Sequence, residues 1–355
     1  MKGKSIYIAR VIYSISWFYL APYIPYIIYK FNIQASLAGF VPFAFFIGSG
    51  TMQVPSAYLS TRIGLRNTLC LGLLIMSISS LFIGLSITFL QLLIFYFVGG
   101  IGASMFFSSG GAILAELNKN NLSRIMGLYN AAFSIGGIVG LNWIFFDKVL
   151  SFTYASLLLS LLTLISLFIN VKLPNVKPTW KTIRNRNILY LGLSTSGVWG
   201  IYYAIGELFP NFAFNFLHLS AIESGEITSL LLFSSFIGGL LGFIGDKIGK
   251  LRGLILASLA GIFPSLLLYT KFFIIGIIIL GIFNELAISI MYSMVAVEAK
   301  GANTGIGLAE VNSLNIVLGT WLDPLATFTG FYSWIILVLI SIIPLFLIRK
   351  LSMSI

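Results

Sequence analysis

Four acidic residues lie inside long apolar stretches of this sequence: Glu207, Glu285, Glu310 and Asp323. An ionisable group is costly to place in such surroundings, so it usually meets a partner, binds a ligand or exchanges a proton. Glu207 and Glu285 are therefore our candidates for binding a proton or a substrate. The alternative for each is a permanently protonated side chain that only forms hydrogen bonds.

Glu207 belongs to a polar stripe along one predicted helix. Residues at steps of three or four share one helix face, and a polar face must meet protein or water if the helix crosses a membrane. We expect Tyr203 and Asn211 to join Glu207 in binding substrate or protons. The stripe consists of Ser196, Gly200, Tyr203, Glu207, Asn211 and Asn215.

The other acidic residues have different neighbours. Glu285 is followed on the same predicted helix face by Ser289 and Tyr292. Glu310 lies about two turns from one end of its segment, so both substrate contact and a gate or packing role stay open. Asp323 precedes a proline, and we interpret it as a hydrogen-bond partner for the backbone groups that the proline leaves unpaired.

The first half of the chain offers aromatic and amide side chains in similar positions. Tyr19, Tyr23 and Tyr26 recur at helical spacing, and Asn130 shares a face with Ser134. A tyrosine stripe can be packing material, or it can line a cavity and bind a sugar, an aromatic solute or a cation. We take Tyr23 and Asn130 as candidate binding residues.

A short charged hairpin separates two apolar stretches in each half. Residues 242–252 read Gly-Phe-Ile-Gly-Asp-Lys-Ile-Gly-Lys-Leu-Arg, and residues 57–66 are a degraded copy that aligns Gly64 with Gly249. The two copies lie about half the chain apart, which indicates two related halves, as in many membrane transporters.

The composition predicts that these elements lie in a membrane. Hydrophobic residues make up 58% of the 355 and charged residues only 9%. A helix needs about 20 residues to cross a bilayer. The apolar runs provide twelve such segments: 6–29, 35–60, 67–87, 89–115, 123–146, 149–171, 188–216, 222–245, 251–270, 272–297, 304–328 and 331–348.

A basic segment at residues 172–187 divides the predicted helices six and six. We therefore expect an N-terminal six-helix bundle in residues 1–171, a cytoplasmic linker, and a C-terminal bundle in residues 188–355. Of the 21 basic residues, all but Lys30, Lys148 and Lys271 fall on one side of such a topology. Basic loops stay in the cytoplasm. Both termini are predicted to be cytoplasmic, in the plasma membrane.

This arrangement resembles the major facilitator superfamily of secondary transporters. The family's hairpin has the pattern Gly-x-Leu-Ala-Asp-Arg-x-Gly-Arg-Arg or Lys, which residues 242–250 follow closely, whereas Thr61 replaces the Asp in the first copy. The resemblance implies two pseudo-symmetric six-helix bundles that rock about a central site.

The resemblance also implies a cytoplasmic gate built from the hairpins. We expect Glu116 to pair with Arg62 and Glu298 with Lys247, while Asp246 meets the start of the predicted helix 123–146 near Ser123 and Arg124. The gate residues implied are Gly242, Asp246, Lys247, Gly249, Lys250, Arg62, Gly64, Arg66, Glu116 and Glu298.

Several absences narrow the expected cargo. No Lys or Arg is predicted to lie deep in the membrane, because Arg10, Lys30 and Lys148 stand near segment ends and can reach the interface. Without a buried cation to replace hydration, neutral or cationic solutes are favoured over anions. No cluster of metal ligands, cofactor motif or nucleic-acid-binding surface is evident, so no metal or cofactor is expected.

The sequence thus predicts a carrier that is not an enzyme: a monomeric, proton-coupled secondary transporter of a small neutral or cationic solute, working by alternating access among membrane lipids. The alternatives are an uncoupled uniporter of the same fold and a membrane protein that senses or assembles without transport. The sequence leaves the substrate and the direction of transport open.

Overall fold

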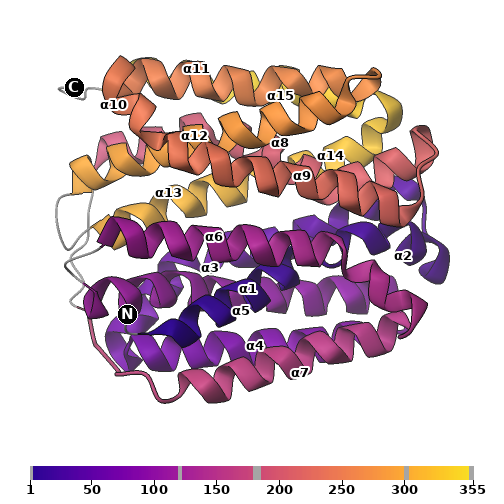
Figure 1. The fold of residues 1–355 in the computed structure, drawn as a ribbon, viewed down its shortest axis with the longest axis horizontal. Coiled ribbons are helices and arrows are strands. Elements are labelled where there is room, and N and C mark those ends of the chain that lie inside the picture. Colours follow the sequence, from indigo (N-terminus) through magenta and orange to yellow (C-terminus); the bar gives the residue numbers. More distant parts are fainter. Residues whose placement is uncertain (1–2, 119–121, 179–184, 300–303, 352–355) are drawn as a thin grey trace.

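The computed structural model describes residues 3–118, 122–178, 185–299 and 304–351. These residues form a layered bundle of helices in which the first half of the chain lies below the second (Figure 1). The helices of the first half are α1 (Lys4–Phe18), η1 (Ala21–Tyr23), α2 (Ile24–Phe31), η2 (Ala35–Gly39), α3 (Phe40–Ile63), α4 (Leu65–Gly84), α5 (Phe89–Leu117), α6 (Leu122–Leu141), η4 (Trp143–Lys148) and α7 (Phe152–Asn170).

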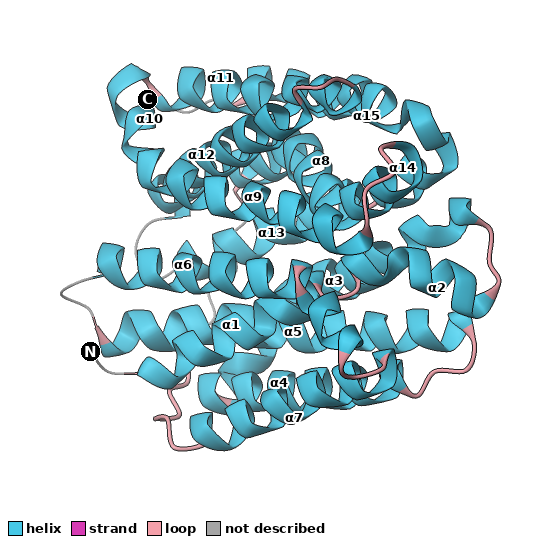
Figure 2. Cartoon of the chain, turned by 45° about the vertical axis from the view of Figure 1, so that its right-hand side comes forward, coloured by secondary structure: helices cyan, strands magenta, loops and turns pink. Residues whose placement is uncertain are grey.

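The second half repeats this series of long helices. Its elements are α8 (Arg186–Phe216), α9 (Ala221–Leu240), η5 (Leu241–Phe243), α10 (Ile244–Ile248), α11 (Lys250–Ile262), η6 (Phe263–Tyr269), α12 (Phe273–Ala299), α13 (Thr304–Gly319), α14 (Leu322–Thr329), η8 (Gly330–Tyr332), α15 (Ser333–Ile342) and η9 (Ile343–Lys350). Figure 2 shows that helix is the dominant structure and that loops at the two ends of the bundle connect successive helices.

The chain is an all-α polytopic membrane protein. Each of the twelve expected segments contains helix, and nine stretches within the described residues are long and apolar enough to cross a membrane. The last of them, Ile306–Lys350, covers two expected segments. Large apolar side chains such as Phe168, which is 64% exposed, cover the outside of the bundle and suit a lipid environment. The count of twelve crossings stays a prediction.

Helix packing repeats between the halves, as the duplicated hairpin predicts. In the first half α1 packs against α6 and α3 against α5; in the second half α8 packs against α13 and α9 against α12. Across the interface between the halves, α3 contacts α13 and α6 contacts α9. Exchanging the two halves converts one of these contacts into the other. The division at residues 171 and 188 remains a prediction.

The two hairpin turns share one backbone conformation. Gly64 and Gly249 both have φ of 90°, a region that is strained for residues with a side chain. Each glycine ends one helix and begins the next, at the end of the bundle where both chain termini lie (Figure 1). We call this the hairpin end and the opposite end the far end.

The first membrane segment is broken near the far end, which the sequence pattern did not predict. Pro22 and Pro25 lack the N–H that a continuous helix needs, and the chain passes from α1 through η1 into α2 around them. Tyr19 and Tyr23 therefore do not continue one straight helical stripe with Tyr26.

The halves meet tightly at the far end. Thr327 Oγ1 donates to the Ser36 carbonyl at 2.6 Å, and Asn142 Nδ2 donates to Ser229 Oγ at 3.0 Å. Nearer the middle, Ser313 Oγ donates to the Gly50 carbonyl at 2.8 Å. The first two of these bonds join the halves at the far end, and the third joins them beside the centre of the interface.

Candidate functional site

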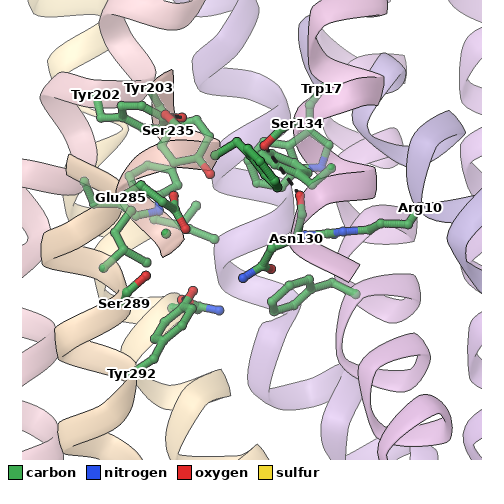
Figure 3. Close-up of a pocket in the computed structure, with 18 of the residues that line it drawn as sticks. Arg10, Trp17, Asn130, Ser134, Tyr202, Tyr203, Ser235, Glu285, Ser289 and Tyr292 are labelled. Carbon is green, nitrogen blue, oxygen red and sulfur yellow. Dashed lines mark hydrogen bonds between the residues drawn. The ribbon is translucent and has the colours of Figure 1, made fainter. Parts of the chain in front are cut away.

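A cavity of about 160 Å³ lies between the halves near the middle of the bundle. Helices α1, α3, α5 and α6 of the first half line it together with α8, α9, α12 and α13 of the second (Figure 3). Its lining side chains are Arg10, Tyr13, Trp17, Gln53, Phe107, Asn130, Phe133, Ser134, Trp199, Tyr202, Tyr203, Ser235, Phe236, Leu240, Glu285, Ile288, Ser289, Tyr292, Asn312 and Ile316, with Gly239.

Aromatic rings close the cavity toward the far end. Trp199 and Tyr203 stack with their centroids 4.2 Å apart, and Trp17 lies 5.5 Å from Tyr203 across the interface. Phe46 of α3 contacts Trp17, Trp199 and Tyr203. We call these four residues the aromatic floor. Since they come from both halves, the floor must come apart if the halves separate here.

The cavity opens toward the hairpin end. Trp17 and Trp199 in the floor are buried, whereas Asn130 and Leu240 on the walls are exposed. Exposure thus rises from the floor toward the hairpin end, opposite to the end that the inter-half hydrogen bonds close.

Arg10 corrects the expectation that no basic residue lies deep. Its side chain is only 4% exposed and reaches from α1 into the cavity rather than to the membrane surface (Figure 3). It is the one basic residue among the described residues that line the cavity. The reason for favouring neutral or cationic solutes over anions, the absence of a buried basic residue, is therefore wrong.

Four aromatic rings hold the Arg10 guanidinium. Its central carbon lies 4.4 Å from the ring centre of Tyr13, 4.5 Å from Tyr129, 4.6 Å from Phe133 and 4.9 Å from Phe107. Ring faces attract a cation without using its N–H groups. Nε and Nη1 are buried and have no hydrogen-bond partner among the described residues.

Glu285 lies across the cavity from Arg10, on α12 (Figure 3). The two side chains interact electrostatically but form no ion pair within 4 Å among the described residues. Ser289 and Tyr292 follow on the same face and also line the cavity, as their spacing predicts. Tyr292 donates its hydroxyl to Asn312 Oδ1 at 2.7 Å, which joins α12 to α13.

Neutral polar groups complete the walls. Tyr202 and Ser235 share a hydrogen bond of 2.7 Å, and Ser134 donates to the Asn130 carbonyl at 3.5 Å. Gln53 is buried, and its Oε1 has no hydrogen-bond partner among the described residues. The described lining residues thus offer one cation, one carboxyl group and several neutral hydrogen-bonding groups.

Three of the candidate binding residues line the cavity: Glu285, Tyr203 and Asn130. Glu207 lies outside it. Its carboxyl group is buried at 1% exposure, Oε1 lacks a hydrogen-bond partner among the described residues, and its electrostatic neighbours are Asp323 and Tyr96. Asp323 accepts a bond from Thr320 Oγ1 at 3.2 Å.

The remaining candidates also lie outside the cavity. Asn211 accepts a bond from Asn215 at 3.0 Å, and the Tyr23 ring packs against Phe152 at 5.3 Å. Glu310 is half-buried on α13. None of these three residues therefore lines the cavity in this conformation.

Sequence reasoning missed Arg10, Trp17, Trp199 and Gln53. The spacing of Arg10, Tyr13 and Trp17 puts them on one face of the first helix, a signal that could have found two of them.

The gate pairs stay predictions. Arg62 donates to the Tyr58 hydroxyl at 2.5 Å, and Arg66 donates to Asn67 Oδ1 at 3.0 Å. Glu298 accepts a bond from Asn185 Nδ2 at 2.8 Å. Glu116, Lys247 and Lys250 also make interactions. The side chains of Asp246, Ser123 and Arg124 lie outside the described residues.

The part of the chain that the structure describes holds no group of three or more His, Cys, Asp or Glu side chains that could bind a metal ion.

Comparisons with known proteins agree with this architecture. A family model described as Major Facilitator Superfamily matches residues 6–320. A probable nitrate transporter, NarT of Staphylococcus epidermidis, is 22% identical over 311 residues, covering 81% of this chain and 79% of the relative.

Solved structures are similar in fold. A bacterial homologue of the human lysosomal transporter Spinster, inward-facing and occupied, has a TM-score of 0.73 at 14% identity, covering 98% of this chain and 95% of that one. The human organic anion transporter MFSD10 has a TM-score of 0.72 at 14% identity, covering 97% and 98%.

Proposed function

Because the chain belongs to the Major Facilitator Superfamily, we propose that it moves a small solute across the membrane by alternating access. It is a membrane transporter and not an enzyme. The observation that supports the mechanism is the central cavity, which both halves line and whose described lining residues become more exposed toward the hairpin end, while hydrogen bonds join the halves at the far end. A site between two repeats becomes open to the other side when the repeats rock about it.

The hairpin end is the cytoplasmic end in this proposal. Most basic residues lie there, including Arg62, Arg66 and Lys247, and cytoplasmic loops are rich in such residues. The conformation described here then faces inward. We further propose that the protein works as a monomer in the plasma membrane with both termini in the cytoplasm, in contact with membrane lipid.

Proton coupling is assigned to Glu285 in place of Glu207. A coupling carboxyl group must meet both the solute and the water that delivers the proton, and Glu285 lines the open cavity. Glu207 is buried outside the cavity, toward the far end, in this conformation.

The solute is not restricted to neutral or cationic compounds. That restriction rested on the absence of a buried Arg, and Arg10 removes it. The Staphylococcus epidermidis relative is described as a probable transporter of an anion, nitrate.

Alternating access can be tested without knowing the solute. The chain has one cysteine, Cys70, so Cys70→Ser gives a cysteine-free background for Ser289→Cys in the cavity wall. A membrane-impermeant maleimide should modify this cysteine rapidly from the cytoplasmic side of oriented vesicles and slowly from the outer side.

The control is Asn67→Cys, an exposed position at the hairpin end that should react from the cytoplasmic side alone. Equal rates from both sides at Ser289→Cys would indicate an open pore. Reaction from one side only, under all conditions, would contradict transport.

A further inference from the structure

We propose that the cavity binds a small, planar, monovalent oxyanion, such as a carboxylate or nitrate, through two of its oxygen atoms at Arg10. Glu285 takes up one proton when the anion binds. This inference rests on the proposed transport function, because it names the cargo of the same cavity. Three features of the cavity support it: the unpartnered donors of Arg10, the position of Glu285 and the small volume.

Arg10 has hydrogen-bond donors without acceptors. Buried Nε and Nη1 lack partners among the described residues, although buried polar groups are nearly always paired. The guanidinium presents its N–H groups as a planar fork, which matches two oxygen atoms of a planar oxyanion. A ligand with that geometry would satisfy the donors together.

The rings around Arg10 hold it without competing for these donors. Tyr13, Phe107, Tyr129 and Phe133 come from three helices of one half and contact the guanidinium within 4.9 Å of their centres. Cation–π contact fixes the side chain without occupying Nε and Nη1, which stay available to a ligand. The cation is thus positioned before the anion arrives.

In the empty cavity, the charge of Arg10 is balanced by a carboxyl group that does not touch it, that of Glu285. Glu285 is the one acidic residue among the described lining residues, and no ion pair within 4 Å joins it to Arg10 there. The other titratable groups near Glu285 are Tyr202, Tyr203 and Tyr292. Tyrosines stay neutral at physiological pH. Among the described lining residues, Arg10 and Glu285 therefore set the charge of the cavity.

An anion on Arg10 takes over the role of counter-charge. A carboxylate at Glu285 would then repel the anion, and binding a proton there removes the repulsion. With Glu285 ionised, the described residues of the empty cavity carry one positive and one negative charge; the loaded cavity holds Arg10, the anion and a neutral Glu285. Its net charge is zero in both cases, which ties one proton to each anion.

The walls limit the size of the ligand. A cavity of about 160 Å³ is smaller than typical sites for drug-sized ligands. Gln53 Oε1 lacks a partner, and Asn130 and Ser289 also face the space. They can receive the hydroxyl or other polar part of a short carboxylate.

The test is anion binding to the purified full-length protein in lipid nanodiscs, measured as thermal stabilisation by sodium nitrate and sodium acetate. Choline chloride at equal ionic strength is the reference. At least one of the two salts should raise the melting temperature above the reference, and affinity should strengthen as pH falls, by up to about tenfold per pH unit for one linked proton.

Substitutions at the two charges separate their roles. Arg10→Gln should weaken binding by about 30-fold or more, since charged hydrogen bonds are lost. Arg10→Lys keeps the positive charge but not the planar N–H groups, so it should also bind the anion weakly. Because this variant retains the buried charge, its weak binding would show that misfolding does not cause the loss of affinity. Glu285→Gln should bind the anion at least as tightly as the original protein at low pH, without pH dependence.

Lys30→Gln is the matched control. Lys30 also contacts aromatic rings, Phe31 and Phe152, but lies outside the cavity, so its removal should leave anion binding unchanged. Undiminished anion binding by Arg10→Gln, or no stabilisation of the original protein by either salt, would overturn the proposal. The maleimide experiment is independent of the anion, so alternating access can hold even where anion binding fails.

Discussion

Glu207 and Glu285 are both carboxyl groups within membrane helices, yet only Glu285 reaches the cavity. In proteoliposomes, Glu285→Gln should abolish the effect of an imposed pH gradient on uptake of the anion, because its amide cannot carry a proton. Glu207→Gln should keep that effect, with an uptake rate within about threefold of the original, because it alters only packing beside Asp323 and Tyr96.

The measurement is initial uptake with and without a gradient of one pH unit. Loss of the gradient effect in Glu207→Gln, with Glu285→Gln unaffected, would return the coupling role to Glu207. Loss of the effect in both would mean that the proton passes between the two carboxyl groups.

Residue types predicted the second-half wall of the site but not its cation. Glu285, Ser289 and Tyr292 could be found because one helix carries all three at helical spacing. Arg10 was misjudged because its distance from the start of the helix suggested an exposed end. Its burial depends on rings of α5 and α6 that are far away in sequence.

At the scale of elements, two glycines with different surroundings allow a direct comparison. A Cβ on Gly100 of α5 would lie 2.0 Å from the Phe45 carbonyl of α3, whereas nothing lies within 4 Å of a Cβ on Gly249. Gly100→Ala should therefore destabilise the protein by roughly 3 kcal/mol, because two backbones must separate. Gly249→Ala should cost less, about 1–2 kcal/mol, because its backbone strain is not joined by a steric clash.

Thermal unfolding in detergent, followed by circular dichroism, would compare the two variants. An equal loss of stability would show that α3 and α5 can move apart at little cost in free energy. The close contact at Gly100 would then not be what holds these two helices of the first half together.

The helices themselves were largely predictable, whereas their breaks and faces were only partly so. Twelve apolar runs predicted where helix occurs, and Gly64 and Gly249 predicted the turns. The stripe on α8 was predicted as one functional face, but Tyr203 meets the cavity while Glu207, one turn farther, meets the closed far end. A repeat of about 3.6 residues specifies a helix face but not where along it a cavity ends.

At the scale of the whole molecule, the duplicated sequence predicts the duplicated packing. Exchanging the two halves converts the contact of α3 with α13 into the contact of α6 with α9. The sequence did not predict which end is closed, because that depends on the contacts between halves in one conformation.

The far-end contact between Asn142 and Ser229 gives the final prediction. In the Cys70→Ser background, cysteines at these two positions, joined by a short bis-methanethiosulfonate linker, should hold the far end closed and stop uptake of the anion; reduction of the link should restore it. The matched control joins Ser77 to Ser160, whose hydroxyls lie 3.1 Å apart within the first half. That link should leave uptake unchanged, because a rocking half moves as a unit. Uptake that continues with the far end linked would mean that the solute crosses without separation of the halves there.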